Sequence, residues 1–160
     1  MKRTRTLGGI ALALALGMGC GDVEFNAPDW PEWRTPDDPA AQVRVNWEWR
    51  GQVAAGQQVE VKTVFGDIRG VPTAGSEVVV KATKIGRAGA VDDVRIDVVP
   101  HASGVTICAV YPDVPGHAPN RCAPGDGGNM TVWDGGRGVV RVNFVVEVPD
   151  GVNLIAKTLW

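Results

Sequence analysis

The sequence predicts an all-β domain over residues 43–160, and three observations lead to this expectation. Its apolar segments are short and rich in Val, Ile and Thr, whose β-branched side chains suit a pleated sheet better than a helix. Turn residues interrupt these segments roughly every ten residues. Past Gly21, no stretch of about 11–18 residues carries apolar side chains at helical spacing. The pattern is typical of an antiparallel-rich β-sandwich or a short β-solenoid-like sheet with repeated strand-turn units.

The first three strands are expected at residues 43–50, 59–63 and 77–85. Apolar and polar residues alternate along the first two, so one face of each should be buried, with the tryptophans of 43–50 pointing inward. The third strand, EVVVKATKI, contains three consecutive valines. Turns are expected at Gly66-Asp67 and at residues 72–76, where glycine and proline interrupt the pattern.

Four further strands are expected at residues 94–98, 105–111, 139–148 and 153–160, with a long Gly- and Pro-rich loop at 112–130. The last strand is apolar on both faces, so it needs cover on both faces or a central position in a sheet. We therefore expect it to pair antiparallel with 139–148 through the Pro149-Asp150-Gly151 turn. Left unpaired, it would be an exposed apolar edge, so we also expect Trp160 to be partly covered.

One internal repeat links distant parts of the chain. Residues 59–65 (VEVKTVF) and 154–160 (LIAKTLW) match in their apolar positions and share a Lys-Thr pair. Repeated strand-turn units are typical of stacked architectures, in which each copy covers its neighbour's apolar face. Chance similarity between two valine-rich strands is the competing interpretation. The sequence stops where the second copy would continue into a Gly-Asp turn, so we expect a shortened repeat protein or a fragment of a longer one.

Five segments carry a family resemblance: VEVKTVFGDIRG, SEVVVKATK, VRIDVV, GVTICAVYP and VVEVPDGVNLIAKTLW. They resemble the bacterial DUF4097 proteins, which are described as adhesins, over about residues 43–160. In that family a strand followed by Asn-Gly-Asp-Ile recurs, and here Phe65 stands where asparagine is usual. The resemblance implies β-strand repeats in a solenoid-like sheet on an exported or membrane-anchored protein. It supplies no catalytic residue.

The first 20 residues are organised like an export signal. A basic start, MKRTRT, precedes an apolar run of roughly 13 residues, which is shorter than the about 20 that a membrane-spanning helix needs. The run ends in Leu16-Gly17-Met18-Gly19-Cys20, which resembles the bacterial lipobox, where the signal peptide is cut before a cysteine that receives lipid. We therefore predict a lipoprotein signal peptide at 1–19 and lipidation at Cys20. Gly17 stands where the lipobox prefers leucine, so ordinary signal-peptidase cleavage is the competing interpretation.

Residues 20–42 are rich in proline and acidic side chains and lack apolar periodicity, which predicts an extended tether between the lipid and the domain. Because Gly21 rather than aspartate follows the cysteine, the expected address is the outer membrane, with the domain periplasmic or facing the cell surface. The chain has 16 Lys and Arg against 18 Asp and Glu, so it lacks the basic excess that nucleic-acid binding needs. The expected partners are the membrane, through the lipid, and an envelope protein or glycan.

Cys108 and Cys122 remain as a pair once Cys20 is lipidated. An even pair in an oxidising compartment favours a disulfide, which here would close a Pro- and Gly-rich loop. The competing interpretation is a zinc site formed with His101 and His117, but these spacings match no usual zinc pattern. We expect the disulfide, and we expect no metal or other cofactor.

The sequence contains no convincing catalytic constellation. Ser76 and Ser103 lie in turns without a nucleophile-elbow pattern. His117 lies in the loop near Asp113, a possible carboxylate partner, although a solvated loop histidine is the commoner case. We therefore predict a membrane-anchored cell-envelope lipoprotein with an adhesin-like binding or structural module and no catalysis. The alternative is a cryptic envelope hydrolase that uses the 108–122 loop as its active site.

Overall fold

A computed structural model describes residues 42–133 and 138–159 of this chain. These residues form ten strands and one four-residue helix, so the predicted all-β class is confirmed. The elements are β1 (Gln42–Gly51), β2 (Gln58–Thr63), β3 (Ile68–Thr73), β4 (Val78–Arg87), α1 (Ala90–Asp93), β5 (Arg95–His101), β6 (Gly104–Val110), β7 (Arg121–Cys122), β8 (Gly128–Asn129), β9 (Arg141–Pro149) and β10 (Asn153–Thr158). The predicted signal peptide, Cys20, the tether up to residue 41 and Trp160 lie outside the described residues.

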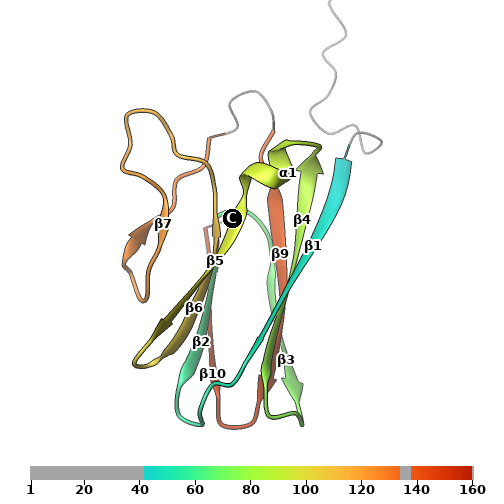
Figure 1. Ribbon diagram of the computed structural model, residues 1–160, viewed down its shortest axis with the longest axis vertical. Helices are drawn as coiled ribbons and strands as arrows, with labels where there is room; N and C mark the ends of the chain where they lie inside the picture. The colour runs from blue at the N-terminus through green and yellow to red at the C-terminus, as the bar shows by residue number, and fades with distance from the viewer. Residues whose placement is uncertain (1–41, 134–137, 160) are drawn as a thin grey trace, which may run out of the picture. The chain divides into compact units, whose positions relative to one another are not determined.

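The strands form two four-stranded sheets and one two-stranded sheet (Figure 1). The first sheet has the order β1-β4-β9-β3, and the second has the order β10-β2-β6-β5. Both are mixed: β3 is parallel to β9 in the first, and β2 is parallel to both β10 and β6 in the second. The other pairs in these two sheets are antiparallel. The two-residue strands β7 and β8 pair with each other in the long loop after β6.

One apolar core is shared by the two four-stranded sheets. Each strand turns alternate side chains toward the core, as the two-residue period of a strand requires. Val59 and Ile107 contribute from the second sheet, and Val80 and Phe144 contribute from the first; all four side chains are fully buried. The tryptophans of β1 are partly buried and pack against the same core, as their alternation predicts.

Strand β3 was not expected, because residues 72–76 were predicted to form a turn. It contains Gly70 and Pro72, which both weaken a strand pattern. β3 pairs only with β9 at an edge of its sheet, and a residue without an N–H group is tolerated there. Gly70 also gives room to β10, because a Cβ atom at this position would lie 2.5 Å from Cδ2 of Leu154.

The expected antiparallel pairing of residues 139–148 with 153–160 is wrong. β9 lies in the first sheet, whereas β10 lies in the second and pairs parallel with β2. The Pro149-Asp150-Gly151 turn is present, but it carries the chain from one sheet to the other instead of closing a hairpin. The carbonyl of Gly151 accepts a hydrogen bond from the N–H of Gly56, at 2.7 Å, which joins this turn to the one before β2.

The internal repeat explains why β10 pairs with β2. Residues 59–63 of β2 face residues 154–158 of β10 one to one, so Lys62 lies opposite Lys157. Equivalent residues of the two copies therefore share one face of the sheet at the same level, and the apolar rows of β2 continue into β10. The sequence similarity of the two segments thus corresponds to direct, in-register pairing.

Candidate functional site

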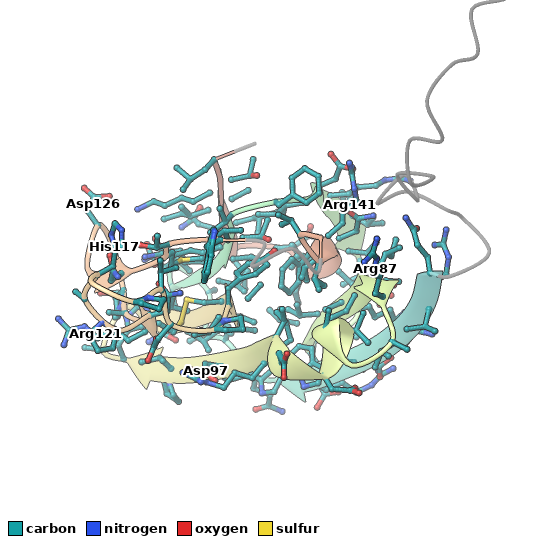
Figure 2. All side chains as sticks on the ribbon, turned by 90° about the horizontal axis from the view of Figure 1, so that it is seen from above. Arg87, Asp97, His117, Arg121, Asp126 and Arg141 are labelled. Atoms are coloured by element: carbon teal, nitrogen blue, oxygen red, sulfur yellow. A yellow bond between two sulfur atoms is a disulfide. The ribbon has the colours of Figure 1, made fainter. Side chains whose placement is uncertain are left out.

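The loop of residues 111–130 folds over the outer face of the second sheet, which is the face away from the core. A disulfide between Cys108 on β6 and Cys122 on β7 attaches the loop there, and the two Cα atoms lie 5.6 Å apart. This pairing is the one expected from the sequence, and it removes both cysteines from the alternative zinc site. Figure 2 shows the loop with His117, Arg121 and Asp126 on the side of the domain away from Arg87 and Arg141.

A charge cluster, made up of Glu60, Lys62, Lys157 and Asp126, lies where this loop covers the sheet. The strand register places Lys157, Lys62, Cys108 and Asp97 in one row across β10, β2, β6 and β5. Alternation along β2 assigns Glu60 and Lys62 to its polar face. Even so, these residues are only 1% and 5% exposed, because the loop excludes solvent from that face.

The two carboxylate oxygens of Glu60 differ, because Oε2 accepts hydrogen bonds whereas Oε1 accepts none and has ion-pair partners only. Oε2 accepts hydrogen bonds from the Thr106 hydroxyl and from the N–H of Gly125, each at 2.9 Å. Oε1 lies 3.0 Å from Nζ of Lys157 and 3.7 Å from Nζ of Lys62. Burial alone would raise the pKa of the Glu60 carboxyl, but the hydrogen bonds and the charge of Lys62 outweigh burial and hold this pKa below its ordinary value. Glu60 is therefore ionised at neutral pH.

The two lysines bind the backbone of the loop. Nζ of Lys62 donates to the carbonyls of Ala123, at 2.7 Å, and Gly125, at 2.5 Å. Nζ of Lys157 donates to the same Gly125 carbonyl at 2.8 Å and to the carboxylate of Asp126 at 2.9 Å. Two like charges opposite each other on neighbouring strands would repel, but Glu60 and the loop oxygens lie around both of them. The two ammonium groups thus bind the carbonyl and carboxylate oxygens of the loop and hold them close to the sheet.

The charge cluster holds the loop on the sheet through ion pairs and hydrogen bonds. The two ammonium groups differ in pKa, because burial lowers the pKa of Lys62 even though the nearby Glu60 carboxylate favours its charged form. The hydrogen bond to Asp126 and the nearby Glu60 carboxylate instead raise the pKa of the Lys157 ammonium. His101 extends the network, with Nε2 at 3.0 Å from the Thr106 hydroxyl, but that hydroxyl is 0% exposed and no substrate can reach it.

A second surface, at one end of the domain, has the character of a binding site. We call it the apolar end and define it as Phe65, Met130, Val132, Trp133, Val139 and Leu159. Three adjoining hollows there share Val132 in their walls. One, of about 370 Å³, includes His117, another, of about 380 Å³, includes Phe65 and Leu159, and a small one, of about 60 Å³, includes Tyr111.

The apolar end exposes large side chains. Among the described residues, the large exposed apolar side chains are Leu159 (66%), Trp133 (65%), Val139 (38%), Val145 (38%) and Val43 (36%). The two most exposed, and three of the five, belong to the apolar end. Contiguous exposed apolar surface with hollows in it is typical of a site that binds a partner.

Hydrogen bonds hold in place the two segments that carry the apolar end. The side-chain amide of Asn120, a residue only 4% exposed, donates to the carbonyls of Tyr111 and Thr131 at 3.1 and 2.7 Å. The Tyr111 hydroxyl donates to the carbonyl of Val140 at 3.0 Å. These bonds join both segments that carry the apolar end, 130–133 and 138–140, to the start of the loop.

His117 lies beside the apolar end, as part of the wall of the 370 Å³ hollow. Asp113, which sequence analysis offered as its carboxylate partner, uses Oδ1 to accept a hydrogen bond from the N–H of Asn120 at 2.7 Å. That carboxylate therefore stabilises the loop backbone. His117 borders a hollow, but among the described residues no hydrogen bond or ion pair joins its imidazole to an acidic side chain.

The residues that now stand out were not predicted from the sequence. Trp133 and Leu159 belong to no chemical motif, and Glu60 and Lys62 look like the solvent face of an ordinary strand. One usable indication was present: Trp133 lies in a Gly-rich segment, outside any alternating strand pattern that would bury it.

This chain has no match among protein-family models, curated proteins or solved structures. Within residues 42–133 and 138–159, no helix is long and apolar enough to cross a membrane. The apolar end and the sequence motifs are therefore the basis of the functional proposal.

Proposed function

We propose that this protein is a cell-envelope lipoprotein, anchored in the bacterial outer membrane by lipid on Cys20, whose β domain is an adhesin-like binding module without catalysis. The apolar end carries this proposal, because a hollowed apolar surface on a rigid scaffold suits binding. The lipobox-like sequence and the tether support the anchor. The disulfide fits an oxidising compartment outside the cytoplasm.

For the fold, our proposal is a two-sheet β-sandwich assembled from strand-turn units of the kind that the DUF4097 resemblance implies. The passage from β2 to β3 through Gly66-Asp67 supports this, since it links a strand of one sheet to a strand of the other. Gly66 has φ 140°, and a Cβ atom there would lie 2.1 Å from the carbonyl oxygen of Val142, so the turn requires glycine. The in-register pairing of β2 with β10 supports the repeat.

The anchor is tested by mass spectrometry of the protein extracted from the membrane fraction. We expect an acylated N-terminal Cys20, and we expect Cys20→Ser to release the protein from that fraction. A wild-type chain that is soluble and begins at another residue would refute the lipoprotein assignment.

The binding module is tested with the immobilised protein and a whole envelope fraction. The double variant Trp133→Ser, Leu159→Ser should retain much less envelope material than the wild type. Val145→Ser is the control, because Val145 is also an exposed apolar residue, at 38%, but lies on the outer face of the first sheet, within β9. Equal retention by the wild type and the double variant would contradict a binding role for the apolar end.

A cryptic hydrolase remains the second candidate, because His117 borders a hollow of about 370 Å³. If the loop is an active site, His117→Ala abolishes an activity found by screening ester, amide and glycosidic substrates. Unchanged turnover in that variant excludes the histidine as a base.

A further inference from the structure

We infer that the apolar end docks on the surface of a lipid bilayer, the one in which the anchor is held. This inference rests on the proposed function and names the partner of the same surface. Three features of the structure carry it: where the chain enters the domain, which side chains gather there, and how short the predicted tether is.

The chain enters the described domain at the apolar end. The strand register places Arg44 of β1 opposite Ile85 of β4, and Ile85 opposite Arg141 of β9. The first residues of β1 and β9 therefore lie at one end of the first sheet, at the top of Figure 1. Val139 comes just before β9 and belongs to the apolar end, and Val43 comes just before Arg44. The predicted tether joins the domain at this end, because it leads directly into Gln42.

Val43 adds to the exposed apolar surface of this end. Val43 lies opposite Gly86 of β4. Gly86 is close to Val140, the neighbour of Val139, because a Cβ atom at Gly86 would lie 3.1 Å from the Val140 side chain. Of the five large exposed apolar side chains among the described residues, four are therefore found where the tether enters. Only Val145 lies elsewhere.

The side chains at this end match the interfacial region of a bilayer. Tryptophan favours this region because its ring is apolar while its indole N–H can reach water or headgroups. The guanidinium of Arg141 lies over the Phe65 ring, with 4.5 Å between Cζ and the ring centroid, and can reach lipid phosphate from the rim of the apolar end. Asp67 lies 4.0 Å from the same guanidinium.

Charge at this end is mixed. Arg44, Arg87 and Arg141 lie along the first sheet, while Asp92 and Asp93 belong to α1 and Asp67 lies beside Arg141. Binding should therefore depend on Trp133 and its apolar neighbours more than on the anionic lipid content of the membrane. This distinguishes the inferred docking from a purely electrostatic attraction.

The length of the tether makes even weak docking effective. Twenty-one residues, 21–41, separate Cys20 from Gln42. A proline-rich, extended chain of this length would span at most roughly 65 Å, which keeps the domain at about millimolar effective concentration near the lipid. A dissociation constant in the millimolar range is then enough to hold the apolar end on the membrane for about half of the time.

The test measures sedimentation of the mature chain, from residue 20 with Cys20→Ala, with vesicles of phosphatidylcholine and phosphatidylglycerol. This chain carries no lipid, so the result does not depend on whether wild-type Cys20 is acylated. We expect vesicle binding that falls at least tenfold in the double variant Trp133→Ser, Leu159→Ser, because each loses most of its apolar surface. Val145→Ser should stay within about twofold of the parent. Equal melting temperatures show that the exposed substitutions leave the fold intact.

Each outcome decides the inference. Absence of vesicle binding by the parent chain overturns it, and so does an equal loss in Val145→Ser. Retention by purified peptidoglycan or by an envelope protein, with none by vesicles, also overturns it but leaves the proposed binding module standing. Vesicle binding without acylation of Cys20 in the wild type supports the docking surface and refutes the proposed anchor, so the two failures are distinguishable.

Discussion

Replacing Glu60 by glutamine should destabilise the domain by about 3 kcal/mol or more at neutral pH. The glutamine keeps the shape of the side chain, and its carbonyl oxygen can still accept hydrogen bonds from Thr106 and Gly125. The charge is lost, however, beside Lys62, which is only 5% exposed, and beside Lys157. Removing one partner of a buried ion pair costs about 3–5 kcal/mol. We expect the lower part of that range, since Lys62 retains its bonds to the loop carbonyls.

The pH dependence of this effect follows from the pKa of Glu60. The pKa of the folded state lies below the ordinary value of 4.5, so the ionised carboxylate favours folding. Its contribution to stability is fully present above about pH 4.5 and is lost as the pH falls through the lower pKa of the folded state. Glu60→Gln should therefore lower the free energy of unfolding at pH 7 and reduce its decline in acid.

Urea unfolding followed by tryptophan fluorescence measures both effects between pH 7 and pH 3. The control is Glu147→Gln, because Glu147 forms an ion pair with Lys81 at 2.6 Å on the surface, where the two side chains are 31% and 45% exposed. Such surface pairs contribute little, so the control should unfold much like the wild type. If Glu60→Gln lowers the stability no more than Glu147→Gln does, the charge cluster does not hold the loop on the sheet.

Three further predictions concern the scaffold. Replacing Cys108 and Cys122 by serine should cost about 3 kcal/mol, because a loop of this size gains that much from closure, and an unchanged melting temperature would contradict it. Gly104→Ala should destabilise the domain strongly, since the φ angle of Gly104 is 135° and the new Cβ atom would lie 1.9 Å from the carbonyl oxygen of Gln58 on β2. Gly56→Ala is the control: its Cβ atom would lie in open space, so it should lower the free energy of unfolding by only about 1–2 kcal/mol in the same assay. Deleting residues 153–160 should cause aggregation or loss of the cooperative transition, because it uncovers the edge of β2; a monomeric deletion variant that melts like the parent would show that β10 is dispensable.

Local patterns in the sequence were sufficient for most of the longer strands, β3 excepted, but not for their partners. The alternation in residues 43–50 and 59–63 depends only on which side chains point to each face, and both segments are strands. Pairing depends on parts of the chain that are distant in sequence. The Pro149-Asp150-Gly151 turn looks like a hairpin connection, yet it passes between sheets, because β10 lies in register along β2.

What the sequence by itself determined is the all-β class and most strand positions, which follow from side-chain periodicity, and the pairing of Cys108 with Cys122, which was expected once Cys20 was assigned to lipid. Only the tertiary structure decided what covers each surface. Glu60 has the sequence context of a solvated strand residue and becomes buried because the loop folds over it. Trp133 has no partner pattern in the sequence and becomes part of the apolar end because two loop segments meet the ends of β2 and β10. Burial is a property of which distant segments come together, and no local spacing of residues specifies it.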